Sequence, residues 1–332
     1  MGRRDFITLV GVTAMIPCIS VLLIAGAVIG AGAAHANDHV RVGKAQGSAW
    51  TFLPLDIGVE QGLFAKQGLD IESADLAGDA KVQQALAAGS IDFGLGSGPG
   101  MAFSAKGSPA IAVAAFAGPP RNISAIVLHD SAVEKIADLK GKLIAVSTTG
   151  SLSDWLAKQM AIQEGWGQDG IRAVPLGAIP TSIAALKTRQ VDAVVLATEA
   201  GFRLEEHKDG RVLATMDRYA PHFITHVVFA QKSLVADNPG LVARFLQGFF
   251  PAIAFVQTHK EETSSLAERV LQQSPGLARR VYDLEAGMLI DDGRFEPRAV
   301  TTLKQSFIDM KTLQSMPADA ELFTTQFLPV KR

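Results

Sequence analysis

The chain has 332 residues, more than one hydrophobic core usually supports, so we expect two lobes. Its 31 basic and 33 acidic residues nearly balance, which argues against a nucleic-acid partner. The single cysteine, Cys18, lies in an apolar N-terminal segment, so the remainder of the chain can form neither a disulfide nor a thiolate metal site.

The N-terminal segment has the pattern of an export signal. Arg3-Arg4 precedes a stretch from 6 to 34 that lacks Asp, Glu, Lys and Arg, and Ala34-His35-Ala36 is a small-x-small cleavage signature. We interpret residues 1–36 as a signal peptide and expect a periplasmic protein that begins at Asn37. The apolar stretch is also long enough to span a bilayer, so an uncleaved anchor is the alternative. The arginine pair resembles a twin-arginine export signal, which leaves the export route open.

The chain after this segment begins with a strand, a loop and a helix. Apolar residues alternate over 40–42, small and polar residues follow over 46–51, and apolar residues recur at helical spacing over 52–59. Ligands of open α/β sheets bind in loops at the carboxyl ends of strands, so this loop is a candidate binding loop. Trp50 offers a flat apolar face to an organic ligand, and the alternative is that it packs against its own helix. The candidate ligand-binding residues of the loop are Gln46, Ser48, Trp50 and Thr51.

A glycine-rich loop follows another predicted strand. Residues 81–88 have helical spacing, residues 91–95 alternate as a strand, and a Gly-Ser-Gly-Pro-Gly loop leads into a further helix. Backbone N–H groups at Ser97 and Gly98 are therefore candidates for ligand contact. The alternative is a tight turn that requires glycine. The loop is not a Walker phosphate loop, because no Gly-Lys-Ser/Thr follows it.

A hydroxyl-rich loop provides the most suggestive chemistry. It follows a buried-strand run over 143–146 and precedes a helix with one apolar stripe. Hydroxyls, unpaired N–H groups and the positive end of the helix dipole favour an anion at such a place. Ordinary N-capping by Ser151 or Ser153 is the structural alternative. The candidate ligand-binding residues here are Thr148, Thr149, Gly150 and Ser151.

A further strand, over 191–196, ends at Thr198 and Glu199, which complete the candidate site. Glu199 could receive an amine or amide of a ligand, and the alternative is a structural role at a helix start. Strand patterns over 110–117, 123–129, 173–176 and 226–230, and a long helix from Asn238-Pro239, fill the rest of the scaffold.

The order of these elements predicts an inserted lobe. We interpret residues 38–126 together with 227–332 as the first lobe and residues 127–226 as the second. The chain then crosses between the lobes twice, and this geometry permits hinge closure over a ligand.

The sequence offers few patterns that indicate catalysis. After the N-terminal segment the histidines are scattered, and there is no HExxH, no cysteine-histidine zinc spacing, no GxSxG and no GxGxxG after a strand. We therefore predict no catalytic residue, no metal site and no cofactor.

Several short motifs carry a resemblance to a known family. They are Glu60-Gln61-Gly62-Leu63-Phe64, Gly68-Leu69-Asp70-Ile71-Glu72, Ile91-Asp92-Phe93-Gly94, Asp138-Leu139-Lys140-Gly141-Lys142 and Asn238-Pro239. In this order they resemble the periplasmic substrate-binding proteins of the nitrate, taurine and aliphatic-sulfonate uptake type, over nearly all of the chain after the leader. The resemblance implies an α/β fold of the periplasmic-binding-protein type II, with each lobe a βα sandwich and a hinge between them.

The same resemblance implies a function. The protein would capture a small anionic ligand, as a monomer, and deliver it to an ABC permease in the inner membrane. Sulfonate, nitrate, taurine, an aromatic acid and a pyrimidine all suit the candidate loops, and Trp50 favours an organic ligand over bare nitrate.

Two alternatives use the same scaffold. The fold also resembles the enzymes that make the thiamine pyrimidine and a chorismate dehydratase, and fold alone cannot choose between binding and catalysis. The export signal favours binding, because cofactor biosynthesis is normally cytoplasmic, and residues 37–332 lack the cysteine cluster of the pyrimidine synthases. A sensor that docks on a membrane receptor when loaded would need the same cleft.

Overall fold

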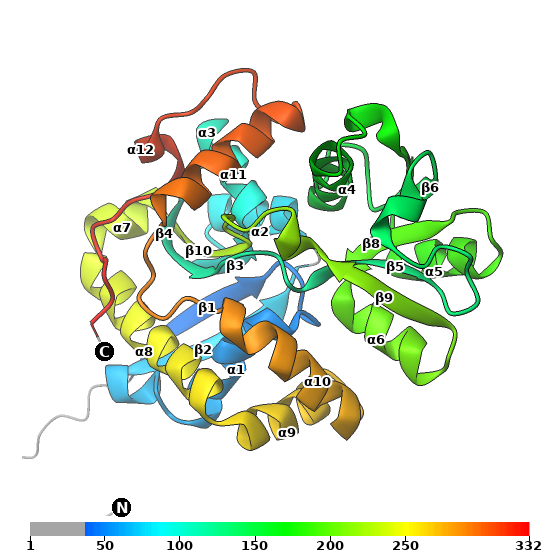
Figure 1. The fold of residues 1–332 in the computed structure, drawn as a ribbon. Coiled ribbons are helices and arrows are strands. Elements are labelled where there is room, and N and C mark those ends of the chain that lie inside the picture. The colour runs from blue at the N-terminus through cyan, green and yellow to red at the C-terminus, as the bar shows by residue number, and fades with distance from the viewer. Residues whose placement is uncertain (1–36, 77, 332) are drawn as a thin grey trace, which may run out of the picture. The chain divides into compact units, whose positions relative to one another are not determined.

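Two five-stranded sheets, each covered by helices, organise the protein (Figure 1). The computed structural model describes residues 37–76 and 78–331, all within one unit, Ala36–Arg332. The expected signal peptide, residues 1–36, lies outside the described residues. We call the part built on the first sheet the first lobe and the part built on the second sheet the second lobe, and the expected two-lobed α/β fold class is confirmed.

The first sheet has the strand order β2-β1-β3-β10-β4. β1 is parallel to β2 and β3, whereas β10 is antiparallel to β3 and β4. Every residue of β4 is buried, and its sequence is a continuous apolar run, while β1 alternates in burial over residues 39–42. The strands are β1 (Asp38–Lys44), β2 (Leu69–Asp75), β3 (Phe93–Ser97), β4 (Ala110–Ala117) and β10 (His226–Gln231).

The second sheet repeats this arrangement with the order β7-β6-β8-β5-β9. β6 is parallel to β7 and β8, and β5 is antiparallel to β8 and β9. In both sheets the antiparallel strand that follows a crossing between the lobes starts beside the carboxyl end of a parallel strand. His226 of β10 faces Ser97 of β3, and Ile123 of β5 faces Ala197 of β8. The strands are β5 (Ile123–Leu128), β6 (Leu143–Val146), β7 (Arg172–Pro175), β8 (Ala193–Ala197) and β9 (Gly210–Thr215).

The helices surround these sheets (Figure 1). Those of the first lobe are α1 (Leu53–Glu60), α2 (Asp79–Ala87), α3 (Met101–Ala105), α7 (Lys232–Asp237), α8 (Pro239–Thr258), α9 (Lys260–Val270), α10 (Pro275–Glu285), α11 (Pro297–Asp309) and α12 (Asp319–Leu322). Those of the second lobe are α4 (Leu152–Gln163), α5 (Ile179–Lys187) and α6 (Thr198–Glu206).

Local sequence explains where the long helices begin. The side chains of Asn238, Ser274 and Glu296 accept a backbone N–H of the first turn of α8, α10 and α11, and a proline follows each cap. α8 is the one helix of the described residues that is long and apolar enough to cross a membrane. Its apolar residues instead pack in the core of the first lobe, where Phe245 stacks on Phe93 with ring centroids 4.0 Å apart.

The chain passes from the first sheet to the second between Ala117 and Ile123 and returns between Thr215 and His226. The first crossing lies a few residues before the expected boundary at 126, because residues 123–126 already pair with β8 and β9. The strand β9 was not predicted. It lies at the edge of its sheet and its residues are mostly half-buried, so its sequence lacks a clear alternation.

Candidate functional site

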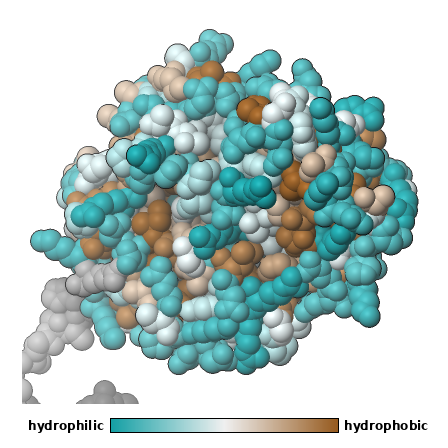
Figure 2. Space-filling view, viewed as in Figure 1, coloured by the Kyte–Doolittle hydropathy of each residue, from teal (hydrophilic) through white to brown (hydrophobic). Residues whose placement is uncertain are grey.

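Two adjoining cavities lie between the lobes, where loops from both sheets meet. Their volumes are about 360 Å³ for the first cavity and about 470 Å³ for the second. Gln46, Asn122, Ile179 and Ala197 line both, so the two cavities adjoin one another. Figure 2 shows apolar patches between the two lobes on an otherwise largely hydrophilic face. A site of this size suits a small organic molecule.

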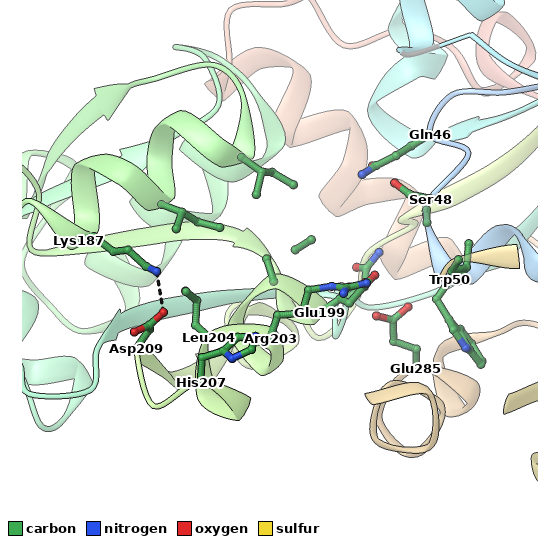
Figure 3. Close-up of a pocket in the computed structure, with 17 residues that line it drawn as sticks. Gln46, Ser48, Trp50, Lys187, Glu199, Arg203, Leu204, His207, Asp209 and Glu285 are labelled. Atoms are coloured by element: carbon green, nitrogen blue, oxygen red, sulfur yellow. Dashed lines mark hydrogen bonds and ion pairs between the residues drawn. The ribbon is translucent and has the colours of Figure 1, made fainter. Parts of the chain in front are cut away.

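The first cavity combines apolar walls with charged groups (Figure 3). Trp50 from the first lobe and Ile179, Ile183 and Leu204 from the second contribute apolar surface. Its charged residues are Lys187, Glu199, Arg203, Asp209 and Glu285.

Each cation of the first cavity already has a carboxylate partner. Lys187 Nζ lies 2.6 Å from Asp209 Oδ2. Arg203 donates from Nε and from a terminal nitrogen to Glu199 Oε1, at 3.0 and 2.7 Å. Glu285 is the remaining charged group, and the described residues give it no hydrogen bond or ion pair.

Glu285 is also the most deeply placed of these groups, with 4% of its surface exposed. Burial first, and the nearby Glu199 second, raise the pKa of Glu285 to about 8. The carboxyl group is therefore largely protonated at neutral pH. In Figure 3 it points toward Glu199, which the second lobe presents from the start of α6.

The second cavity is polar. Asp79, at the start of α2, accepts hydrogen bonds from the backbone N–H of Ser97 at 2.8 Å and from its hydroxyl at 2.6 Å. Burial raises the pKa of Asp79, and the two hydrogen bonds from Ser97 act in the opposite direction. Asn122, Ser153 and Ser182 line the same cavity as Asp79.

His226 lies where the chain returns to the first lobe. Its ring packs against both Phe52 and Phe116, with centroids 4.9 and 5.6 Å away, and burial lowers its pKa to about 4. Its Nδ1 has no hydrogen-bond partner among the described residues, and its Nε2 lies 3.4 Å from the side-chain nitrogen of Asn122. The imidazole is neutral at pH 7 and serves as a polar edge of the second cavity.

The structure brings five of the twelve predicted residues to the cavities. Gln46 lines both, Ser48, Trp50 and Glu199 line the first, and Ser97 lines the second. The other seven are absent from both linings: Thr51, Gly98, Thr148, Thr149, Gly150, Ser151 and Thr198. Thr51 and Thr198 are fully buried, and Thr198 exchanges a 2.6 Å hydrogen bond with Ser124.

The loop before α4 uses its own donors, as the structural alternative anticipated. Ser151 is the N-cap, and its hydroxyl accepts the backbone N–H of Asp154 at 3.3 Å. Asp154 in turn accepts the N–H of Gly150 at 2.8 Å and pairs with Lys158. The neighbouring Ser147 and Ser153, and not residues 148–151, reach the second cavity. A carboxylate of the chain thus occupies the place where an anionic ligand was expected.

The glycine-rich loop is a tight turn. The N–H of Gly98 donates to the carbonyl of Thr225 at 2.9 Å, and a Cβ on Gly98 would overlap the carbonyl oxygen of Ile224. Close approach of two backbones therefore explains this glycine. The N–H groups of Ser97 and Gly100 are likewise used, by Asp79 and by the Ser97 hydroxyl.

Trp50 lines the first cavity and packs against α10, whereas the sequence alternative was packing against its own helix. It is only 2% exposed because its indole packs edge-on against Tyr282, with centroids 5.9 Å apart.

Glu285, Asp79, Asn122 and Arg203 were not among the predicted residues. For Glu285 the sequence holds a usable signal. Ala278, Val281 and Tyr282 are the buried residues of the preceding turns of α10, and Glu285 continues their 3–4 spacing. A glutamate on the apolar stripe of a helix is a reason to suspect a buried carboxylate.

Among the described residues, no group of three or more His, Cys, Asp or Glu side chains is arranged to hold a metal ion.

Comparison with known proteins gives a family match and a fold match. The model of the family described as NMT1/THI5 like matches residues 50–263. A Brucella abortus protein, provisionally named a binding protein, is 28% identical over 239 residues, which cover 71% of this chain and 72% of that protein.

Among solved structures, the periplasmic aliphatic sulphonate binding protein SsuA from Escherichia coli matches with a TM-score of 0.74 and 18% identity, over 86% of this chain and 92% of that one. The desulfurization enzyme DSZB matches with a TM-score of 0.64 and 16% identity, over 88% and 97%. At these identities the two likenesses show the fold, which is that of the periplasmic binding proteins and is shared by an enzyme.

Proposed function

The chain belongs to the NMT1/THI5-like family, and from this premise and the geometry of its cavities we propose that it is a solute-binding protein that captures a small organic molecule between its lobes. One observation carries the proposal: side chains of both lobes line two adjoining cavities at the strand ends where the chain crosses twice between the sheets. Closure of two lobes over such a space buries a ligand from both sides.

The proposal includes export and delivery. The N-terminal sequence pattern supports export to the periplasm, where the molecule would hand its ligand to an ABC permease. The Escherichia coli neighbour is a periplasmic sulphonate-binding protein by name, which is consistent with this role. N-terminal sequencing of protein recovered from a periplasmic extract tests the export step, with Asn37 as the expected first residue.

The chemistry of the lining favours an organic ligand with an apolar body. Trp50, Ile179, Ile183 and Leu271 offer surface that a bare inorganic ion cannot use. Polar groups lie at both ends, in the second cavity around Asp79 and in the first around Glu199.

A thermal-shift panel tests the proposal. The purified protein is melted with alkylsulfonates, taurine, nitrate, aromatic carboxylates, pyrimidines and small amines, and each hit is analysed by mass spectrometry after incubation. At a hundred times its dissociation constant, a ligand adds about 2.7 kcal/mol to stability, which raises Tm by several degrees. Recovery of an unchanged ligand is expected. A chemically altered hit would favour an enzyme on this scaffold.

A variant locates the binding. Ile179 lines both cavities, so Ile179→Trp should fill their junction and abolish the ligand-induced shift. Ile162 on α4 is 38% exposed and lines neither cavity, so Ile162→Trp is the matched control and should leave the shift intact. Retention of the full shift in Ile179→Trp would place the binding site elsewhere.

A further inference from the structure

Two carboxylates, one from each lobe, face each other across the first cavity. Glu285 ends α10 of the first lobe, and Glu199 lies in the first turn of α6 of the second (Figure 3). Glu199 is 20% exposed at its side chain, and Glu285 is 4% exposed. Two buried carboxylates of like charge repel one another, so their proximity costs free energy unless a proton or a cation lies between them.

Attractive contacts hold α6 and α10 together beside this pair. Arg280 of α10 pairs with Glu205 of α6, and its guanidinium lies 3.8 Å from the ring centroid of Phe202. At the other end of α10, Ser274 donates a hydrogen bond to Glu206 at 2.9 Å. In this structure these contacts hold the two helices together and so place Glu199 beside Glu285.

One carboxylate of the first cavity, that of Glu285, has no cationic partner among the described residues. Arg203 is directed at Glu199 Oε1 and Lys187 at Asp209, so neither cation is directed at Glu285. Glu285 is a deeply buried acceptor, turned into the cavity, that the described residues leave without a partner. A buried carboxyl group of this kind calls for a hydrogen-bond donor, and a cationic donor satisfies it best.

We propose that Glu285 and Glu199 bind a protonated nitrogen of the captured solute, of the ammonium or amidinium type, between the two lobes. This inference rests on the proposed solute-binding function and specifies the ligand class for it. The apolar wall of Trp50, Ile179 and Ile183 takes the carbon body next to that nitrogen. An organic cation fits better than a metal ion, because the described residues offer no third His, Cys, Asp or Glu ligand to the pair.

Binding of a cation displaces the proton of Glu285, so the charges balance: one proton leaves as one positive group enters. Of the charged groups around Glu285, Glu199 of α6 is the one that acts on it directly. Arg203, His207, Lys187 and Asp209 line the same cavity, and Tyr282 and Arg280 lie on α10.

The test uses three probes of nearly equal size and different charge: benzamidine, benzamide and benzoate. Their affinities for the purified protein are measured by calorimetry at pH 7 in two buffers of different ionisation enthalpy. Benzamidine should bind at least tenfold more tightly than benzamide and benzoate, with the release of close to one proton. Equal affinities, a preference for benzoate, or the absence of binding by all three would overturn the inference.

Variants test whether Glu285 and Glu199 cause the expected preference for benzamidine. Glu285→Gln keeps the shape of the side chain, so it should weaken benzamidine at least tenfold, abolish proton release and leave benzamide within twofold. Glu199→Gln should weaken benzamidine in the same direction. Glu261, an exposed partner of Arg279, is the carboxylate control, and Glu261→Gln should change nothing. Unchanged benzamidine affinity in Glu285→Gln would refute the assignment.

The two proposals fail separately. If alkylsulfonates or other anions bind, and Ile179→Trp abolishes that binding, the protein is a solute-binding protein whose ligand is not cationic. If cations or anions bind but none depends on residue 179, the binding site lies elsewhere, and if no solute of the panel binds, the proposed function itself is wrong.

Discussion

Glu285 should make the stability of the unliganded protein fall as the pH rises. Its pKa rises from 4.5 to about 8 on folding, so between these values the folded chain holds a proton that the unfolded chain has lost. Stability therefore declines through this window, by about 1.4 kcal/mol for each pH unit and a few kcal/mol in all, and is constant above it. Glu285→Gln should remove the decline and be the more stable protein at pH 9. Urea unfolding at pH 5, 7 and 9 measures this, and parallel profiles for the two proteins would contradict it.

His226 should act in the opposite direction. Its pKa falls from 6.5 to about 4 on folding, so below pH 6.5 the unfolded chain gains a proton that the folded chain does not bind. Stability is therefore lost as the pH falls through this window, by on the order of 2 kcal/mol near pH 4.5. His226→Phe, whose ring would pack against Phe52 and Phe116, should lose less stability between pH 7 and 4.5 than the parent. An equal loss in both proteins would show that another group titrates.

At the scale of elements, a variant at the start of α4 can distinguish a helix-capping role from a ligand-binding role. Because the Ser151 hydroxyl serves as the N-cap, Ser151→Ala should cost about 1 kcal/mol, a Tm decrease of about 2 °C, without changing ligand affinity. Thermal melts with and without a ligand from the panel check this. A loss of affinity larger than the loss of stability would restore the loop as a ligand site.

The glycine-rich loop should tolerate no side chain at Gly98. A Cβ there meets the carbonyl of Ile224, so Gly98→Ala should cost at least about 2 kcal/mol and lower the yield of folded protein. At Gly240, the exposed start of α8, a Cβ would make only an ordinary contact, 3.7 Å from Asn238 Oδ1, so Gly240→Ala should be neutral or stabilising by up to about 1 kcal/mol. A Gly98→Ala protein as stable as the parent would mean that the two backbones can separate.

Sequence patterns predicted most of the scaffold, because periodicity reports burial. The apolar runs over 110–117 and 143–146 became β4 and β6, and the cap at Asn238 marked the start of α8. The rule that sites lie at the carboxyl ends of strands led to Gln46 and Glu199, which do line the first cavity.

The same patterns could not choose residues within a loop. Ser147 and Ser153 reach the second cavity while Ser151 does not, because the Ser151 side chain turns back to cap its helix. Nor could they find the meeting of Glu199 with Glu285. Those residues are 86 positions apart in the sequence, and the contact of α6 with α10 that unites them is a property of the tertiary structure.

For the whole molecule, contacts between the lobes should tune affinity from outside the cavities. Trp155 of α4 donates to Asp309 of α11 at 3.0 Å, and this hydrogen bond joins the two lobes. A ligand shifts the balance between open and closed lobes by its preference for the closed form, so a contact that favours closure adds to affinity. Asp309→Ala should weaken ligand binding by up to about tenfold, the equivalent of one hydrogen bond to a charged group.

Calorimetry with a ligand from the panel measures this effect. Asp319 pairs with Lys304 within the first lobe, so Asp319→Ala is the matched control and should leave affinity unchanged. If Asp309→Ala also binds within twofold of the parent, the contact does not bias closure.

The carboxylate of Asp154 at the start of α4 has a consequence for selectivity. It accepts the N–H of Gly150 and so competes with a free anion for that donor. Because the carboxylate is held by a short tether, it acts at an effective concentration of about a millimolar or more. A free anion of ordinary affinity must displace it before reaching that helix end. The single substitution Asp154→Ala would remove the competing carboxylate from the positive end of α4. In this chain, binding of a free anion at the start of α4 would therefore require the loss of the Asp154 carboxylate.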